Sequence, residues 1–275
     1  MIKDILVNLP VDSKRAAGAD YAISMATAFD AHITGVAFAY EPVEVGSVFD
    51  GASASFIATF RQQNEAAANA AIAKFNETAR RAGLAAETHV LSASTGGAAN
   101  IFGRMGRTYD ISVLGQTEPD GSPAEDLILE AALFSSGHPV LVVPYIQRAP
   151  VKLDRVLLCW DNSRNAARAF ADALPLLKRA KVIDVVTIAT SEKRNELPGA
   201  DIAHHLARHG LKVELKRIVA PDTDVPNTIL SYVADSSADL VVMGGYGHSR
   251  LREFVLGGAT RGMLSAMTVP TLMSH

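Results

Sequence analysis

The apolar positions of this chain form short aliphatic runs that alternate with longer amphipathic stretches. Residues 3–7 and residues 152–159 have the pattern of buried strands, and an alanine-rich stretch with apolar residues at helical spacing follows each of them. The same succession, β-α-β-α-β-α-β-α-β, then runs through each half of the chain. The further strands that correspond in the two halves are 33–38 and 182–188, 88–91 and 213–219, 110–115 and 239–244, and 139–143 and 270–273.

This repetition predicts both the fold class and the domain organisation. Short aliphatic strands that alternate with helices are typical of parallel sheets covered by helices on both faces. We therefore expect an α/β protein with two tandem open parallel five-stranded sheets of Rossmann-like type, one in residues 1–147 and one in residues 151–275. The first half differs by an insertion rich in small residues, 43–60, which a helix over 62–81 is expected to follow.

Composition narrows the classes of function. The chain has 275 residues, a formal net charge of −3 and one cysteine, Cys159. A charge so close to neutral gives no electrostatic basis for binding nucleic acid or an anionic membrane surface. A single cysteine excludes an intrachain disulfide and a multi-cysteine metal cage. The sequence shows neither a signal-peptide pattern nor an apolar run of about 18 residues, so we expect a cytoplasmic protein.

A glycine-rich segment in the second half, residues 244–258, carries the strongest functional signal. Gly244, Gly247 and Gly257 stand with two and nine residues between them, directly after a predicted strand. Glycines there let backbone N–H groups approach an anion, and a helix expected over 259–266 would add the positive end of its dipole. Ligands of open α/β sheets bind beyond the carboxyl ends of the strands. The segment therefore predicts a phosphate site, although glycine spacing alone would also fit a tight turn without a ligand.

This arrangement resembles the ATP-binding branch of the universal stress protein family, and the resemblance covers essentially the whole chain as two copies. It implies a role in stress response, ATP bound in the second half with or without Mg²⁺, and pairing of domains through their final strands. The matching positions are Asp161 near adenine and ribose, Ile188 against the adenine, Met243 and Gly244 against the nucleotide, and Gly247 and Gly257 around the ribose and phosphates.

One position departs from the family's pattern. The family usually has serine or threonine directly after the third glycine, where a hydroxyl helps to hold phosphate, whereas this chain has Gly258 there. Thr260 is a candidate substitute for that hydroxyl. His248 is a candidate phosphate contact or a cap for the helix that follows. AMP and ADP therefore stay open beside ATP as the bound adenine nucleotide.

The first half has lost the corresponding segment. Glu118, Pro119 and Asp120 follow Gly115, and two carboxylates repel a phosphate while proline lacks a backbone donor. We interpret this half as structural or regulatory. The aliphatic closing strands, 139–143 and 270–273, are expected to pair with each other as an intrachain pseudo-dimer, and a homodimer of chains also stays open.

Several other residues have an ordinary structural explanation beside a functional one. Asp161 also suits a helix N-cap. His205 and His209 stand four apart on a predicted helix, as metal ligands can, but no third ligand accompanies them and an edge-of-core role fits equally well. Cys159 ends a buried strand, where a free cysteine is usually an inert small hydrophobe.

Binding is expected rather than catalysis, because no Gly-Lys-Ser/Thr follows the glycines and no compelling Ser-His-Asp order occurs. Three functions are compatible with the sequence. A nucleotide-binding stress-response protein is favoured. An enzyme on the same fold, such as a slow nucleotide hydrolase with His248 or Asp161 orienting water, is the second. The third is a nucleotide-free interaction module that uses residues 43–60.

Overall fold

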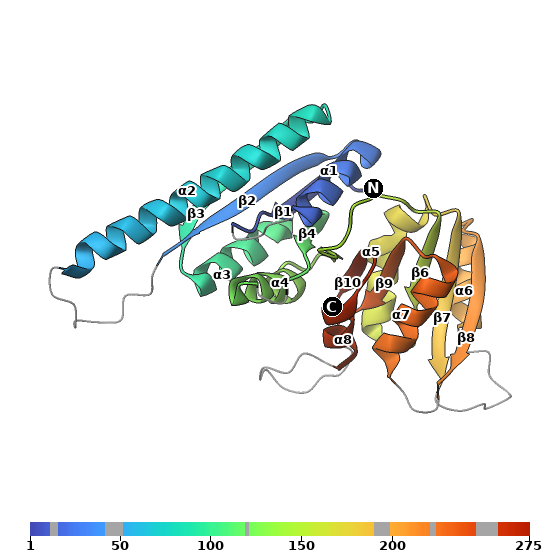
Figure 1. Ribbon diagram of the computed structural model, residues 1–275. Coiled ribbons are helices and arrows are strands. Elements are labelled where there is room, and N and C mark those ends of the chain that lie inside the picture. Colours follow the sequence, from blue (N-terminus) through green and yellow to red (C-terminus); the bar gives the residue numbers. More distant parts are fainter. Residues whose placement is uncertain (12–15, 42–51, 119–120, 190–198, 221–223, 246–257) are drawn as a thin grey trace. The chain divides into compact units, whose positions relative to one another are not determined.

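The computed structural model describes residues 1–11, 16–41, 52–118, 121–189, 199–220, 224–245 and 258–275. The chain folds into two compact units, Ile2–Val140 and Leu141–His275. Each unit contains parallel strands with helices packed on both faces of the sheet (Figure 1). The predicted α/β class is therefore confirmed, whereas the domain limits 1–147 and 151–275 stay predictions.

The N-terminal unit is built around β1, which pairs in parallel with β2 on one side and β4 on the other, while β3 pairs with β2. The helices α1 and α2 pack on one face of the sheet, and α3 and α4 pack on the other. The elements are β1 (Asp4–Asn8), α1 (Ala17–Phe29), β2 (His32–Tyr40), α2 (Ala52–Arg81), β3 (Ala86–Ala93), α3 (Thr95–Met105), the 3-10 turn η1 (Gly106–Thr108), β4 (Ile111–Gly115) and α4 (Pro123–Ser135). The strand β5 (Val140–Val143) begins at the last residue of this unit.

The C-terminal unit repeats this plan with the strand order β10-β9-β6-β7-β8, all parallel. Its strands are aliphatic and its core is formed where α5 packs on β9 and β10. The elements are β6 (Arg155–Cys159), α5 (Arg164–Leu177), β7 (Val182–Ala189), α6 (Ala200–Arg208), β8 (Val213–Val219), α7 (Val225–Ser236), β9 (Leu240–Gly244), α8 (Gly258–Ala266) and β10 (Thr271–Ser274).

The repeat extends to a hydrogen bond at the amino ends of the strands. Asp110 Oδ2 accepts the backbone N–H of Asp4 at 3.0 Å, and Asp239 Oδ2 accepts the backbone N–H of Arg155 at 2.9 Å. In both units an aspartate just before the fourth strand thus fixes the start of the first strand. This agreement supports the internal repeat that the sequence predicts.

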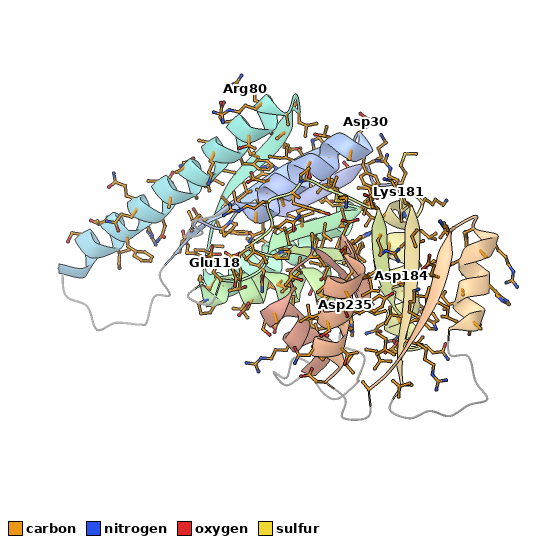
Figure 2. The ribbon with its side chains drawn as sticks, turned by 45° about the vertical axis from the view of Figure 1, so that its right-hand side comes forward. Asp30, Arg80, Glu118, Lys181, Asp184 and Asp235 are labelled. Carbon is orange, nitrogen blue, oxygen red and sulfur yellow. The ribbon has the colours of Figure 1, made fainter. Side chains whose placement is uncertain are left out.

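Helix α2 is longer than predicted. The sequence predicts a helix over 62–81, but α2 begins at Ala52 and so includes the end of the 43–60 insertion. The stripe of least exposed positions continues back from Phe75 to Phe60, so the helical pattern begins before residue 62. Phe75 packs where a side chain at Gly35 of β2 would otherwise lie. Arg80, near the end of the helix, points outward (Figure 2).

Candidate functional site

The predicted site lies at the carboxyl ends of β6, β7 and β9. Gly247, His248 and Gly257 fall outside the described residues. The others follow or end these strands, or belong to α8: Asp161, Ile188, Met243, Gly244, Gly258 and Thr260. The fold therefore brings the described candidates to one edge of the sheet, where ligands of open α/β sheets bind.

Three side chains form an apolar surface at this edge. Cys159 of β6 pairs with Val186 of β7, and Leu158 pairs with Val242, which puts Cys159 beside Met243 of β9. Because side chains alternate between faces along a strand, Cys159 and Met243 share a face with Ile188. Met243 is buried, and the other two are half-buried. The resulting surface suits contact with a flat apolar group.

Asp161 is exposed beside this surface and does not cap α5. Its Oδ1 accepts the N–H of Ser163 at 2.9 Å, while the Ser163 hydroxyl caps the helix by accepting the N–H of Ala166 at 3.1 Å. The helix-cap explanation of Asp161 is therefore wrong, because Ser163 stands closer to the helix start. The carboxylate is left on a turn at the edge of the sheet, where it can accept further hydrogen bonds.

The thiol of Cys159 is expected to be unreactive near neutral pH. Its burial, and secondarily the negative charge of Asp161, raise the pKa of Cys159 to about 12. Thiolate, rather than thiol, is the nucleophile in cysteine chemistry. The side chain therefore acts near neutral pH as a small apolar group, as the sequence predicts.

Helix α8 begins at Gly258, one residue before the predicted start, and no acidic residue stands in its first turn. A Cβ added at Gly258 would meet no heavy atom within 4 Å. Thr260 is 3% exposed, so most of its side chain is enclosed by the protein. Its proposed contact with phosphate stays a prediction.

A residue that the sequence analysis did not single out, Asn165, connects two parts of this edge. It is 6% exposed in the first turn of α5, and its Nδ2 donates to the carbonyl oxygen of Gly245 at 2.5 Å. The helix approaches β9 so closely that a Cβ at Gly244 would lie 2.7 Å from the Asn165 carbonyl carbon. The sequence did contain a signal for this role. Asn165 stands four and eight residues before Ala169 and Ala173, and so shares the apolar face of the predicted helix with them.

The N-terminal unit fills the equivalent edge with its own side chains. Asn8, 2% exposed at the end of β1, donates its Nδ2 to Glu125 Oε2 at 2.6 Å. Glu125 and Asp126 stand in the first turn of α4, and Thr117 donates its hydroxyl to Asp126 at 2.7 Å. The positive end of α4 is therefore neutralised from within the chain. Glu118 and Asp120 were expected to repel a phosphate here, whereas the two acids in the first turn of the helix, Glu125 and Asp126, were not foreseen.

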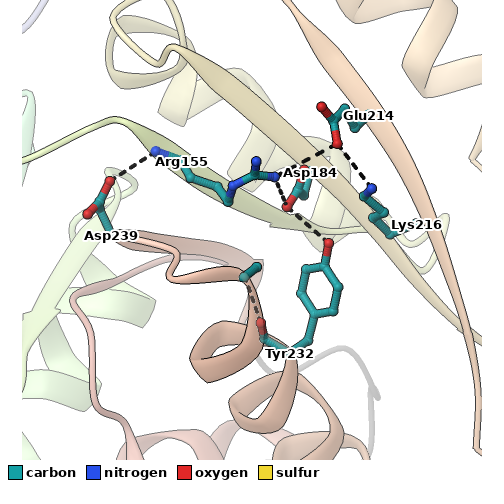
Figure 3. A network of polar contacts seen from close by, with 7 residues as sticks. Arg155, Asp184, Glu214, Lys216, Tyr232 and Asp239 are labelled. Atoms are coloured by element: carbon teal, nitrogen blue, oxygen red, sulfur yellow. Dashed lines mark hydrogen bonds and ion pairs between the residues drawn. The ribbon is translucent and has the colours of Figure 1, made fainter.

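A polar network lies towards the amino ends of β6, β7 and β8, away from this edge (Figure 3). Asp184 is fully buried there and accepts a hydrogen bond from Tyr232 of α7 at 3.0 Å. Burial, followed by this hydrogen bond, raises the pKa of Tyr232 to about 12. A hydrogen bond from Lys216 lowers the pKa of Glu214 at the rim of the network. The network joins α7 to the sheet.

His205 and His209 pack against an aromatic ring instead of gathering further ligands. Their ring centroids lie 4.9 Å apart, and the ring of Phe170 lies 5.4 Å from that of His205. Within the described ranges, no group of three or more His, Cys, Asp or Glu side chains could hold a metal ion. The contacts give both histidines a packing role at the edge of the core.

No helix in the part of the chain that the structure describes combines the length and apolar character needed to cross a membrane.

Comparison with known proteins finds universal stress proteins that are similar to this chain in sequence or in fold. The model of the universal stress protein family matches residues 152–275. Universal stress protein Slr1230 of Synechocystis sp. is 24% identical over 215 residues, which cover 76% of this chain and 72% of that protein.

Two solved structures share the fold over nearly the whole chain. A universal stress protein from Archaeoglobus fulgidus has a TM-score of 0.70 at 16% identity and covers 98% of this chain and 95% of its own. A putative universal stress protein from Pseudomonas aeruginosa has a TM-score of 0.61 at 15% identity, with 99% and 93% covered. The family model thus matches the C-terminal unit, residues 152–275, and the chain is similar in fold to universal stress proteins over nearly its whole length.

Proposed function

We propose that the C-terminal unit binds an adenine nucleotide at the carboxyl edge of its sheet and that the protein acts in stress response through that bound state. ATP, with or without Mg²⁺, is the favoured ligand, with ADP and AMP as alternatives. Binding, without turnover, is the proposed activity. The proposal also includes a cytoplasmic location and a homodimer. Sedimentation of the purified protein tests the homodimer.

The contrast between α8 and α4 carries this proposal. Helix α8 follows the glycine-rich segment and has no carboxylate in its first turn, whereas α4 has Glu125 and Asp126 there. A helix start attracts anions through its free N–H groups and its dipole. In the N-terminal unit the chain itself supplies the anion, held by Asn8. In the C-terminal unit a phosphate group would supply it.

The apolar surface formed by Cys159, Ile188 and Met243 supports an aromatic base as the other end of the ligand. A mostly apolar surface with a few polar groups at its border is typical of small-molecule sites. Asp161 borders this surface with an exposed carboxylate, which can accept hydrogen bonds from ribose hydroxyls. Along one edge of the sheet, the apolar surface thus suits the base, Asp161 suits the ribose and the start of α8 suits the phosphates.

Calorimetric titration of the nucleotide-free protein with ATP, ADP and AMP, each with and without Mg²⁺, tests the proposal. We expect saturable binding at one site per chain that a Gly247→Val variant loses while its circular dichroism spectrum is unchanged. Equal binding by this variant would mean that the nucleotide binds at another site. Absence of binding by the wild-type protein would contradict the proposal and favour the interaction module.

A further inference from the structure

The strand β3 is the terminal strand of the N-terminal sheet. In the part of the chain that the structure describes, it pairs with β2 alone. The N–H of Glu41 donates to the carbonyl oxygen of Ala93 at 2.9 Å, so this carbonyl group of β3 points towards β2. Because the peptide groups of successive residues point to opposite sides of a strand, those of Thr88 and Val90 point outward. The outer edge of β3 therefore presents hydrogen-bonding groups with which another strand can pair.

Two side chains of β3 suit pairing with a second copy of the same strand. Glu87 and His89 lie on one face, 52% and 39% exposed, with 3.1 Å between Glu87 Oε1 and His89 Nε2. In an antiparallel pair of two β3 strands centred on Thr88, the two Thr88 residues exchange main-chain hydrogen bonds. Glu87 of each copy then stands opposite His89 of the other, in the type of pair that brings side chains closest. The carboxylate can thus accept an N–H of the imidazole in the other copy, and this contact occurs twice.

The terminal strand of the C-terminal sheet, β8, is protected against such pairing. It has Glu214 and Lys216 at the places of Glu87 and His89. Lys216 Nζ lies 3.0 Å from Glu214 Oε2, at the rim of the network that joins α7 to the sheet. Charged residues, and lysine above all, are what natural proteins place on an edge strand to prevent association. In contrast, β3 contains neither lysine nor arginine.

We infer that the outer edge of β3 is the surface through which two copies of this chain associate, by antiparallel pairing of their β3 strands about a twofold axis. A twofold axis lets the same surface serve on both copies, as in most homodimers. The inference rests on the proposed function for the homodimer and is independent of nucleotide binding. It makes the sheet of the N-terminal unit continue from one copy into the other.

Sedimentation equilibrium of the purified protein over a range of concentrations tests this surface. We expect a concentration-dependent dimer, and Glu87→Lys should raise its dissociation constant about tenfold or more, since two contacts are lost and replaced by unfavourable ones. The double variant Glu87→Lys/His89→Glu exchanges acid and base and should restore association. Glu214→Lys makes the same change at the equivalent place of β8 and should leave the dissociation constant unchanged.

A second variant acts on the main chain instead of a charge. Val90→Pro removes an N–H that points away from the sheet, and proline is tolerated at such positions of edge strands. This variant should therefore also raise the dissociation constant of the dimer about tenfold or more. Its circular dichroism spectrum should remain that of the folded protein.

Each outcome decides one part. Unchanged association of both Glu87→Lys and Val90→Pro, or an equal loss in Glu214→Lys, would overturn the assignment of the surface and leave the proposed homodimer standing. A wild-type protein that stays monomeric at every concentration would overturn both. A double variant that associates no better than Glu87→Lys would overturn the register centred on Thr88. Calorimetry with ATP reports separately on the nucleotide site, so its failure would leave this surface unaffected.

Discussion

Arg155 and Asp184 form a charge pair in which one guanidinium nitrogen reaches both oxygens of a fully buried carboxylate. Arg155 Nη1 lies 2.8 Å from Asp184 Oδ1 and 2.7 Å from Oδ2 (Figure 3). The arginine is the first residue of β6 and is 31% exposed, so the pair is buried at its acidic end and reaches solvent at its basic end. Because of this asymmetry, the loss of stability depends on which residue of the pair is replaced.

We expect Arg155→Met to lower the free energy of unfolding by about 3 kcal/mol, because it leaves the Asp184 carboxylate buried without a counter-charge. The partial exposure of Arg155 puts the effect at the lower end of the range for buried pairs. The double variant Arg155→Met/Asp184→Leu should recover much of that loss. Urea unfolding measures both, and a double variant less stable than the single one would contradict the argument.

The raised pKa of Tyr232 predicts a loss of stability in alkali. The phenol keeps its proton in the folded state up to about 12, whereas an unperturbed tyrosine titrates near pH 10. This contribution is therefore complete below about pH 10 and is lost as the pH rises towards 12. Unfolding free energies of Tyr232→Phe should therefore decline less steeply over this window than those of the wild type.

Cys159 should resist alkylation until strongly alkaline pH. Its pKa of about 12 keeps the thiol protonated in the folded state, and the nucleophile is the thiolate. Iodoacetamide labelling of the native protein should be slow at pH 8 and fast in denaturant. Because Cys159 is the single cysteine, mass spectrometry reads the result directly. Rapid labelling of the native protein at pH 8 would mean that the thiol is not desolvated.

The crossing of α5 on β9 leaves no space for a side chain at Gly244. A Cβ there would lie 2.7 Å and 2.8 Å from backbone atoms of Asn165 and Ala166, so Gly244→Ala should destabilise the protein by about 1–3 kcal/mol, as for other overpacked sites. Gly96→Ala is the matched control. A Cβ at Gly96, in the first turn of α3, meets nothing within 4 Å, so that variant should be neutral or slightly stabilising.

A carboxylate added to the first turn of α8 should weaken nucleotide binding. Arg261→Asp puts an acid at the position that Asp126 holds in α4, and it would compete with phosphate for the helix start. We expect the dissociation constant for ATP to rise about tenfold or more. Arg104→Asp makes the same change of charge on exposed helix surface of the N-terminal unit and should leave the affinity unchanged.

The strands and their repetition could be predicted from the sequence because they depend on local pattern. The run 213–219 coincides with β8 (Val213–Val219), and 239–244 exceeds β9 (Leu240–Gly244) by one residue. The start of α2 was missed because alanine and serine at 52–55 fit a loop as well as a helix.

The candidate site could be predicted only in part, because its contacts join residues that are distant in sequence. Asp161, Ile188 and Met243 lie at the carboxyl edge, since each ends or follows a strand that the pattern identified, while their contact with a nucleotide stays a prediction. Asn165 and Glu125 were missed. Their roles depend on Gly245, 80 residues away, and on Asn8, 117 residues away, and no local pattern indicates such a partner.

The bond between Asn8 and Glu125 also has a thermodynamic consequence. The counter-charge at the start of α4 belongs to the chain, so its local concentration does not change with the composition of the solution. A binding partner that must be drawn from solution instead stabilises its site in proportion to the logarithm of its concentration. Under the proposed function, added nucleotide should therefore stabilise the C-terminal site as its concentration rises, whereas the bond between Asn8 and Glu125 stays independent of that concentration.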